Sequence, residues 1–385
     1  MTDISLCMIV KNEELTLEPC LSGIAPFVDE IIIIDTGSTD RTKETALRFT
    51  NKVYDYDWIN DFAVARNYSI SKATNEYILV LDSDEVVEQI DMGSIKSLLK
   101  QYPEKIGRLQ RINEFTRKGI PHKYIERVNR LFSKKHYRYE GIIHEQLVPV
   151  KVVKHNTPEY NTLEPGTVEP NIIELKSTNA SQHTENTLDE NNTYLIPLTI
   201  RHSGYEGNLA HRKKKTERNI NLLKKALQQY PNDPYLLYQL GKSYYMEEDY
   251  HDARDFFGQA LYADLDPRLE YVQDMVESYG YSLLNTEQYE TALQLLNIYD
   301  EFSHLADFIF LTALILMNNG RFQEAIQEFK KATKKPECRM EGVNDYLAYY
   351  NIGVIYECLG DIKSAKRNYQ KCTGYDAAKA RLRNL

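Results

Sequence analysis

The sequence predicts two folds in one chain, an α/β domain followed by an all-α domain. Over residues 4–82, short apolar runs alternate with amphipathic stretches, which is the pattern of βαβ units around a mostly parallel sheet. From Arg212 onward the pattern is helical throughout and repeats itself. We therefore expect an α/β domain over residues 1–210 and a helical domain over 211–385. A polar stretch at about 151–192 is predicted to be an insertion in the first domain.

The elements of the first domain follow from the position of their apolar residues. Runs rich in Ile and Val predict strands, and amphipathic stretches between them predict helices. The run Ile31–Ile34 is apolar on both faces, as a buried parallel strand should be. Pro197 lies inside a later strand and predicts that this strand is at an edge. The predicted strands are Ile4–Val10, Glu30–Asp35, Lys52–Tyr56, Tyr77–Asp82 and Tyr194–Ile200, and the predicted helices are Glu13–Ala25, Asp40–Phe49 and Asp61–Ala73.

The helical half contains a repeat marked by small residues. Its anchor alanines are 39, 33 and 40 residues apart, close to the unit of about 34 residues that is typical of tetratricopeptide helix pairs. Four matches in phase predict a solenoid, and an unrelated helical bundle is the alternative. An uncapped end of such a solenoid leaves apolar surface, which would allow a homodimer. The anchors are Ala253, Ala292, Ala325 and Ala365.

Composition limits the function. The 385 residues include 47 basic and 56 acidic side chains, a net charge of −9, which argues against a sequence-independent nucleic-acid binder. Five cysteines without a C-x-x-C pair argue against a disulfide framework or a zinc site. The longest apolar run, Leu311–Met317, is too short to cross a bilayer, so we expect no transmembrane segment and a cytoplasmic protein.

Acidic residues stand at the ends of two predicted strands. Asp35 follows Ile31–Ile34, and Asp82-Ser-Asp84 follows another apolar run. In open α/β sheets ligands bind at this edge, where Asp35 would accept a hydrogen bond from a ribose hydroxyl or a base N–H. Carboxylates two residues apart can hold a divalent cation that bridges two phosphates. The alternative for Asp84 is a helix cap in a solvated turn.

Six motifs together resemble the family 2 inverting glycosyltransferases of the GT-A fold. The likeness is greatest to a bacterial branch with tetratricopeptide repeats behind the catalytic domain. That two-part arrangement also resembles the glycocin peptide S- and O-glycosyltransferases. The motifs are Ser5–Glu14, Asp29–Thr42, Trp58–Asn67, Tyr77–Glu85, Gly141–Glu145 and His202–Tyr205.

The resemblance implies a nucleotide-sugar donor, usually UDP-linked, and a Mg²⁺ or Mn²⁺ ion. Asp84 would be the principal metal ligand, and His202 a further ligand or a diphosphate contact. A strand-end histidine bonded to backbone is the alternative for His202. Asp82 would contact the ribose or the sugar, and Arg66 the base or the diphosphate. The donor-binding positions are then Val10, Asn12, Glu13, Asp35, Arg66, Asp82 and Ser83.

A basic run and a His-Glu pair complete the candidate site. Within residues 211–218, Lys214 or Arg218 could reach the diphosphate, and Arg218 is the better candidate; a solvated helix face is the alternative. Inverting transfer needs a base for the acceptor proton. Many relatives carry two acids at that point, whereas this chain has His144-Glu145. We take Glu145 as the preferred base and His144 as the alternative.

Three functions remain open from the sequence. The first is transfer of a sugar to a Cys or Ser/Thr side chain of a peptide that the repeats recruit, because tetratricopeptide grooves suit extended peptides. The second is transfer to a cell-envelope or capsule glycan precursor. The third is a non-catalytic interaction scaffold, which the presence of Asp35, Asp82 and Asp84 argues against.

Overall fold

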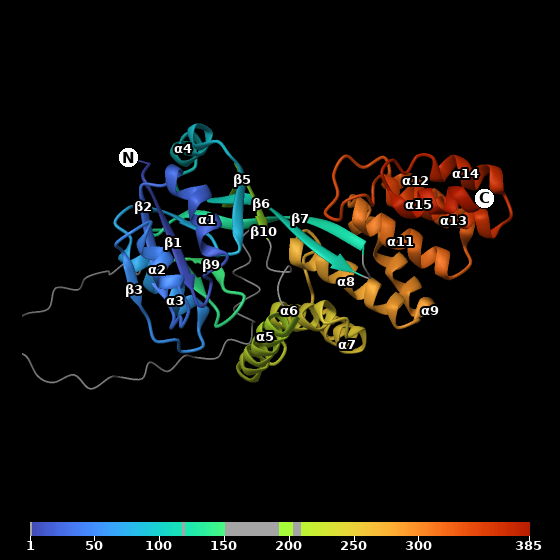
Figure 1. Cartoon of the computed structure of the whole chain (residues 1–385). Helices are drawn as coiled ribbons and strands as arrows, with labels where there is room; N and C mark the ends of the chain where they lie inside the picture. The colour runs from blue at the N-terminus through green and yellow to red at the C-terminus, as the bar shows by residue number, and fades with distance from the viewer. Residues whose placement is uncertain (1, 118–119, 151–191, 203–208) are drawn as a thin grey trace, which may run out of the picture.

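The structure is a computed structural model that describes residues 2–117, 120–150, 192–202 and 209–385. An α/β domain is followed by a curved array of helices (Figure 1), which confirms the predicted fold class. Nearly all of the predicted insertion, residues 151–191, lies outside the described residues. The boundary at residue 210 remains a prediction.

The α/β domain is built on an eight-stranded mixed sheet with the order β3-β2-β1-β4-β7-β6-β10-β5. A separate hairpin, β8–β9, lies beside it. Four strands, β3 to β4 in this order, are parallel, so the prediction of a mostly parallel sheet holds for that half. The strands are β1 (Ile4–Val10), β2 (Glu30–Asp35), β3 (Val53–Asp55), β4 (Tyr77–Val80), β5 (Glu85–Ile90), β6 (Ile106–Arg117), β7 (Ile120–Ser133), β8 (Tyr137–Glu140), β9 (Gln146–Pro149) and β10 (Thr193–His202).

Apolar clusters form on the sheet and bury its parallel strands. Strand β2 has no exposed residue, as its run of isoleucines predicts. Leu17, Leu21 and Ile24 of α1 pack in one cluster, and Ala63 and Ile70 of α3 pack in another. The helices of this domain are α1 (Leu17–Ile24), α2 (Thr42–Leu47), α3 (Phe62–Lys72) and α4 (Met92–Gln101), with a 3₁₀ turn at Ala25–Phe27.

The position of β10 corrects one prediction. Pro197 predicts an edge strand, but β10 lies between β6 and β5 inside the sheet. The pairing of β10 with β6 is interrupted between Leu195 and Thr199, so the proline lies at an irregularity rather than in a regular ladder. On the other side its carbonyl accepts a hydrogen bond from Asp91 N at 3.0 Å.

Helices make up most of residues 209–385. All four predicted anchor alanines are fully buried between paired helices, which confirms the solenoid. In the part of the chain that the structure describes, no helix has the length and apolar character needed to cross a membrane. The helices are α5 (Leu209–Gln229), α6 (Pro234–Met246), α7 (Tyr250–Ala260), α8 (Glu270–Asn285), α9 (Tyr289–Ala292), α10 (Tyr299–Phe302), α11 (Ala306–Asn318), α12 (Phe322–Ala332), α13 (Tyr346–Cys358), α14 (Ile362–Tyr369) and α15 (Asp376–Asn384), with a 3₁₀ segment at Leu293–Ile298.

A long hairpin of β6 and β7 joins the two domains, and the sequence analysis missed it. The hairpin extends from the sheet to the helical array (Figure 1). Tyr124 of β7 donates a hydrogen bond to Asp274 of α8 at 3.0 Å, and Asp274 also accepts from Tyr238 and Lys242 of α6. Tyr124 also forms an antiparallel bridge with Met340. The repeats are thus held against the sheet by its own strands.

Substitution by alanine at two glycines of the solenoid should change the free energy of unfolding in opposite directions. A Cβ on Gly353 would lie 2.5 Å from the buried ring of Tyr369, whereas a Cβ on Gly258 would lie 3.7 Å from Tyr279. We expect Gly353→Ala to lower the free energy of unfolding by about 1–3 kcal/mol through overpacking. Gly258→Ala should raise it by about 0.5–1 kcal/mol through helix propensity. Urea unfolding measures both, and equal effects would contradict the packing described here.

Candidate functional site

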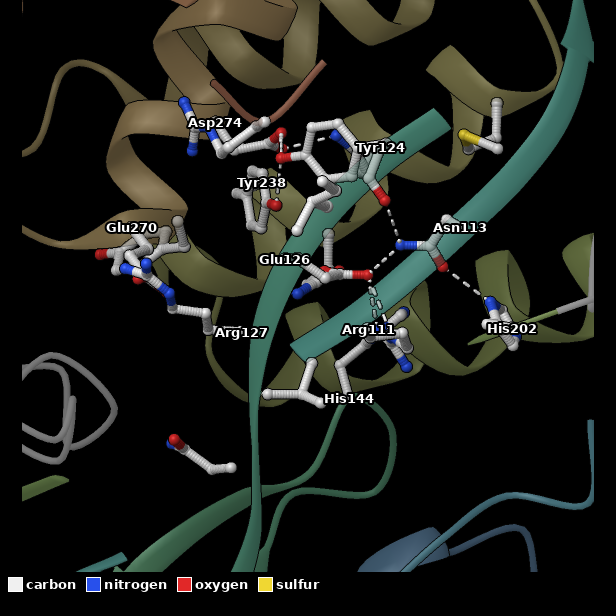
Figure 2. A pocket seen from close by; sticks show the side chains of 18 of the residues that line it. Arg111, Asn113, Tyr124, Glu126, Arg127, His144, His202, Tyr238, Glu270 and Asp274 are labelled. Carbon is white, nitrogen blue, oxygen red and sulfur yellow. Dashed lines mark hydrogen bonds and ion pairs between the residues drawn. The ribbon is translucent and has the colours of Figure 1, made fainter. Parts of the chain in front are cut away.

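A cleft of about 2590 Å³ lies between the carboxyl ends of the parallel strands, the β6–β7 hairpin and the repeats. Figure 2 shows part of it, with β-strand side chains such as Arg111, Asn113 and Glu126 close to Tyr238 and Asp274 from the helices. Polar groups from both domains therefore line one continuous space. The predicted site residues in its wall are Val10, Asn12, Glu13, Arg66, Asp82, Ser83, Asp84, His144, Glu145, His202 and Arg218.

Asp35 differs from the other predicted residues because it is not part of that wall, although its neighbour Thr36 is. Its Oδ1 accepts hydrogen bonds from the backbone N–H groups of Gly37 and Ser38 at 2.8 and 2.7 Å. Its Oδ2 is buried without a hydrogen-bond partner. One oxygen thus shapes the turn after β2, where Gly37 has φ +95°. The other is available to accept from a nucleoside, and that role remains a prediction.

The turn after β1 is held against the turn after β2. Asn12 has a positive φ of 56°, a conformation that asparagine tolerates better than most residues. Its side-chain oxygen accepts from Thr39 N at 2.8 Å, and its own N–H donates to Ser38 Oγ at 2.9 Å. Next to it, burial and the nearby charge of Asp84 raise the pKa of the Glu13 carboxyl. Asn12 therefore positions this corner of the cleft as well as lining it.

Asp84 and His202 come together although 118 positions separate them in the sequence. Asp84 follows β4 and His202 ends β10, and the imidazole Nε2 lies 3.4 Å from Asp84 Oδ2. Lys215 Nζ lies 3.6 Å from the same oxygen. Burial alone would raise the pKa of Asp84, but His202 and Lys215 hold it below its usual value. The carboxylate is therefore charged at neutral pH.

Asp84 and His202 fit a divalent cation that takes only part of its ligands from the protein. A carboxylate oxygen and an imidazole nitrogen suit Mn²⁺, and Mg²⁺ usually takes one or two carboxylates together with water and phosphate oxygens. Among the described residues, no group of three His, Cys, Asp or Glu side chains is placed to hold a metal. Water and donor phosphates would have to complete the coordination by Asp84 and His202. The metal remains a prediction.

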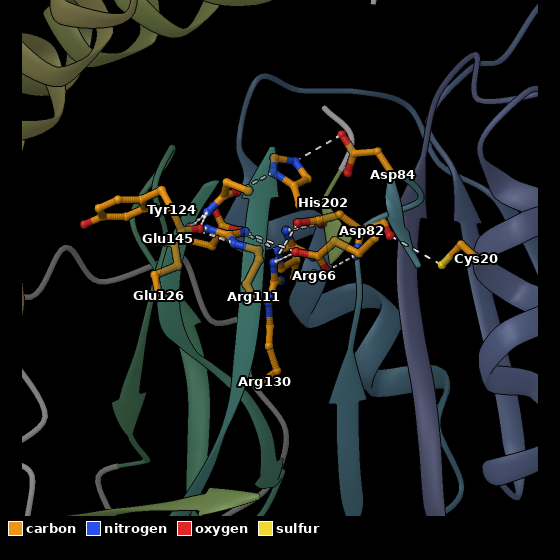
Figure 3. A network of polar contacts seen from close by, with 12 residues as sticks. Cys20, Arg66, Asp82, Asp84, Arg111, Tyr124, Glu126, Arg130, Glu145 and His202 are labelled. Carbon is orange, nitrogen blue, oxygen red and sulfur yellow. Dashed lines mark hydrogen bonds and ion pairs between the residues drawn. The ribbon is translucent and has the colours of Figure 1, made fainter. Parts of the chain in front are cut away.

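A network of arginines and carboxylates lies beneath Asp84 (Figure 3). Asp82 accepts from Arg66 Nη2 and from Arg130 Nη2, each at 2.8 Å. Arg130 also bonds to the fully buried Glu85, and Arg66 Nε bonds to Glu145. The two guanidinium groups outweigh the effect of burial and hold the pKa of Asp82 well below its usual value. Both Asp82 oxygens thus have protein partners.

Local strand geometry places Arg130 in the network. The pairing of β7 with β6 shifts at Gly107/Arg108, so that Arg130 is an extra residue on β7. Such a bulge redirects a side chain, here toward Asp82 and Glu85. Sequence reasoning missed Arg111, Arg130, Glu85 and Glu126 as site residues. The sequence feature that could have indicated them is the presence of charged residues within strands. Arg111 pairs with Glu126 at 2.9 Å and with Glu85 at 3.1 Å.

The two candidate bases lie next to each other on the wall formed by the loop before β9. Glu145 is held by Arg66, and only 10% of its side chain is exposed. His144 has a φ of 50°, and its Nε2 is buried without a hydrogen-bond partner. Burial lowers the pKa of His144 to about 4, with the Glu145 charge opposing this effect and Arg111 adding to it. His144 is therefore neutral at physiological pH.

The depressed pKa of His144 predicts a loss of stability in mild acid. The unfolded chain binds the proton near pH 6.5, whereas the folded chain binds it only near pH 4. The contribution of His144 to the free energy of unfolding is therefore fully present above about pH 6.5. It is lost as the pH falls toward 4, and the loss is about 2 kcal/mol at pH 5. His144→Asn keeps a residue that tolerates the positive φ and removes this titration. Between pH 7.5 and 5, urea unfolding should show a smaller loss in this variant than in the wild type. An identical loss would contradict a buried neutral imidazole.

Arg218 reaches the cleft from the helical side. Its guanidinium lies over the ring of Phe62, 5.2 Å from the centroid, and Phe62 in turn contacts Trp58 edge-on. It also donates to Asn219 Oδ1 at 3.0 Å. Burial lowers its pKa from the usual value, which is so high that the group remains a cation. Arg218 and Lys215 thus contribute positive charge to the wall of the same cleft that Asp84 lines.

Comparison with known families matches both domains. Residues 5–148 match the family described as Glycosyl transferase family 2. The N-terminal domain is a family 2 glycosyltransferase domain. Residues 236–265, 306–334 and 346–379 match tetratricopeptide repeats. The predicted fusion of a glycosyltransferase domain with tetratricopeptide repeats is confirmed.

Known proteins are similar to this chain in sequence or in structure. A tetratricopeptide repeat-containing protein of Synechococcus elongatus is 31% identical, over 68% of this chain and 57% of its own length. The glycosyltransferase SunS of Bacillus subtilis is 26% identical, over 67% of this chain and 53% of its own. The chain thus spans little more than half the length of these relatives. Among solved structures, the tetratricopeptide protein YrrB has a TM-score of 0.38 at 24% identity, over 46% of this chain and 88% of its own.

Proposed function

We propose that the chain transfers a sugar from a UDP-linked donor to a side chain of a peptide, with inversion at the anomeric carbon. The observation that carries this proposal is the shared cleft. Asp84, His202 and Arg218 face the same space as Tyr235 and Tyr271 of the repeats. A donor held at the strand ends is therefore within reach of an acceptor that enters along the helices.

In this mechanism each charged group has a task. The donor diphosphate lies at the ends of β1 and β4, where Asp84 and His202 would hold a Mg²⁺ or Mn²⁺ ion. Such an ion, when bound, neutralises the charge of the departing diphosphate. Lys215 and Arg218 add positive charge on the helical side. Arg66 and Arg130 hold Asp82 in place, ready to accept from a ribose or sugar hydroxyl.

The transfer is one displacement. The acceptor sulfur or oxygen attacks the anomeric carbon while the bond from that carbon to the diphosphate breaks, and the proton of the acceptor goes to a base. We propose Glu145 as this base, because Arg66 fixes its carboxylate in the wall of the cleft. His144 is the alternative, since its neutral Nε2 has no hydrogen-bond partner in the structure.

A thermal-shift screen of UDP-sugars with and without Mn²⁺ tests the proposal, because a ligand that binds only the folded state raises the melting temperature. We expect one UDP-sugar to raise it in the presence of Mn²⁺ and to be hydrolysed slowly to UDP. If no nucleotide sugar binds or is hydrolysed, the chain is a non-catalytic scaffold. Transfer to a lipid-linked glycan but to no peptide would replace the proposed acceptor. The cytoplasmic location and the homodimer remain predictions.

A further inference from the structure

One edge of β7 is paired at both ends and open in the middle. Near the sheet, Leu131 of β7 pairs with Leu79 of β4. Near the repeats, Tyr124 of β7 pairs with Met340. Between them lie Arg127 and Asn129, and no strand in the described part of the chain pairs with this edge at those two residues.

The backbone groups of these two residues point away from β6. Ile125 N donates to Arg339 O at 2.8 Å, and Lys123 O accepts from Glu341 N at 3.0 Å. In this part of β7 the backbone N–H and C=O groups of odd-numbered residues therefore point away from β6. Backbone groups alternate along an antiparallel strand, and the register with β6 is regular from Ile120 to Asn129. The outward groups are then those of Arg127 and Asn129. The Arg127 carbonyl also accepts from Arg108 Nη2 at 3.0 Å and retains a second lone pair.

This open edge borders the cleft. Every residue from 124 to 130 lines it. Neighbouring side chains of a strand point to opposite faces, so seven consecutive lining residues place the backbone of this segment, as well as its side chains, along the cleft. Figure 2 shows this strand crossing the pocket from Tyr124 past Glu126. Its far end leads to Arg130, which bonds to Asp82.

We propose that the acceptor peptide binds as an extended strand that pairs antiparallel with β7 at Arg127 and Asn129. This inference rests on the proposed peptide glycosyltransferase function. The chain itself demonstrates that this edge pairs in this direction, because residues 339–341 already do so one step away. Main-chain bonds of this kind recognise extended peptides with little dependence on sequence.

The direction of pairing sets the order of the peptide. Strand β7 runs from the repeats toward the sheet, so an antiparallel peptide runs from Asp82 toward Met340. The modified residue then lies on the N-terminal side of the paired segment, next to Arg130. Residues that follow it in the peptide pair with Asn129 and then with Arg127.

A proline at position 127 tests the pairing. Arg127→Pro removes the outward N–H without removing a bond to β6, and proline is tolerated at such edge positions. Arg127→Ala is the matched control, since it also removes the exposed ion pair with Glu337. The probe is a pool of capped nonapeptides with a central Cys or Ser and random flanks, and mass spectrometry measures sugar transfer. We expect at least tenfold slower transfer by Arg127→Pro than by Arg127→Ala, with equal hydrolysis of the UDP-sugar by both.

Hydrogen exchange gives a second measurement on the wild-type protein. The amides of Arg127 and Asn129 should be protected when the peptide pool is added with UDP. Equal peptide transfer by the two variants, or no protection, would overturn the pairing. Donor hydrolysis without transfer to any peptide would also overturn it, while leaving a glycosyltransferase with another acceptor. Absence of donor binding would overturn the proposed function itself.

Discussion

Asp84→Asn is expected to lower donor hydrolysis by about two to three orders of magnitude. The carboxylate and His202 are the side chains that we propose to hold a divalent cation, and loss of the charge would then remove several kcal/mol of stabilisation of the leaving diphosphate. The rise in melting temperature with UDP-sugar and Mn²⁺ should disappear together with activity. Release of UDP, measured at saturating Mn²⁺, checks the first effect.

Asp55→Asn is the matched control for this variant. Asp55 ends β3 at the same edge of the sheet, but 77% of its side chain is exposed and it pairs with Lys43 on the surface. Exposed pairs contribute little, so this variant should hydrolyse the donor at the wild-type rate. A rate for Asp84→Asn within threefold of this control would rule out Asp84 as a metal ligand.

The sequence predicted those features of the site that depend on local patterns. An apolar run followed by acids placed Asp35, Asp82 and Asp84 at strand ends, and β2 and β4 end near these residues. The buried alanines revealed the repeats, because close helix packing needs small residues at fixed spacing. The acids are read from a few neighbouring residues and the repeat from a regular spacing along the chain, so neither signal requires a tertiary contact to be known.

The β6–β7 hairpin escaped prediction because its apolar residues lack the period of a strand. Ile106, Leu109, Ile112 and Phe115 recur every third residue, which does not match the alternation of a half-buried strand. Its charged residues are instead paired across the structure. Arg130, for example, contacts Asp82 from 48 positions away.

Contacts between residues far apart in the sequence also altered the roles that had been predicted for single residues. Asp82 was predicted to contact the donor, and no local pattern indicates that two arginines from α3 and β7 hold both of its oxygens. Pro197 indicated an edge strand, yet the irregular register beside it accommodates a proline inside the sheet. In both cases the deciding partner is remote in sequence.

Arg130→Met is expected to lower the free energy of unfolding by about 3–5 kcal/mol, because removing one partner of a buried ion pair leaves an uncompensated charge. Arg130 contacts Asp82 and Glu85 at 2.8 Å each, and Glu85 has no exposed surface. Arg111 and Arg66 remain beside the two acids, so the expected loss is near the lower end of that range. Urea unfolding at pH 7 measures the change.

Arg138→Met provides the comparison for this effect, with the same change of side chain on the surface. The Arg138 side chain is 55% exposed and pairs with Glu140 two residues away, so its loss should cost less than about 1 kcal/mol. If the free energies of unfolding of the two variants differ by less than 1 kcal/mol, water or a rearranged Arg66 must compensate the charges of Asp82 and Glu85. Asp82 would then not depend on Arg130 for its position, and the bulge in β7 would need another explanation.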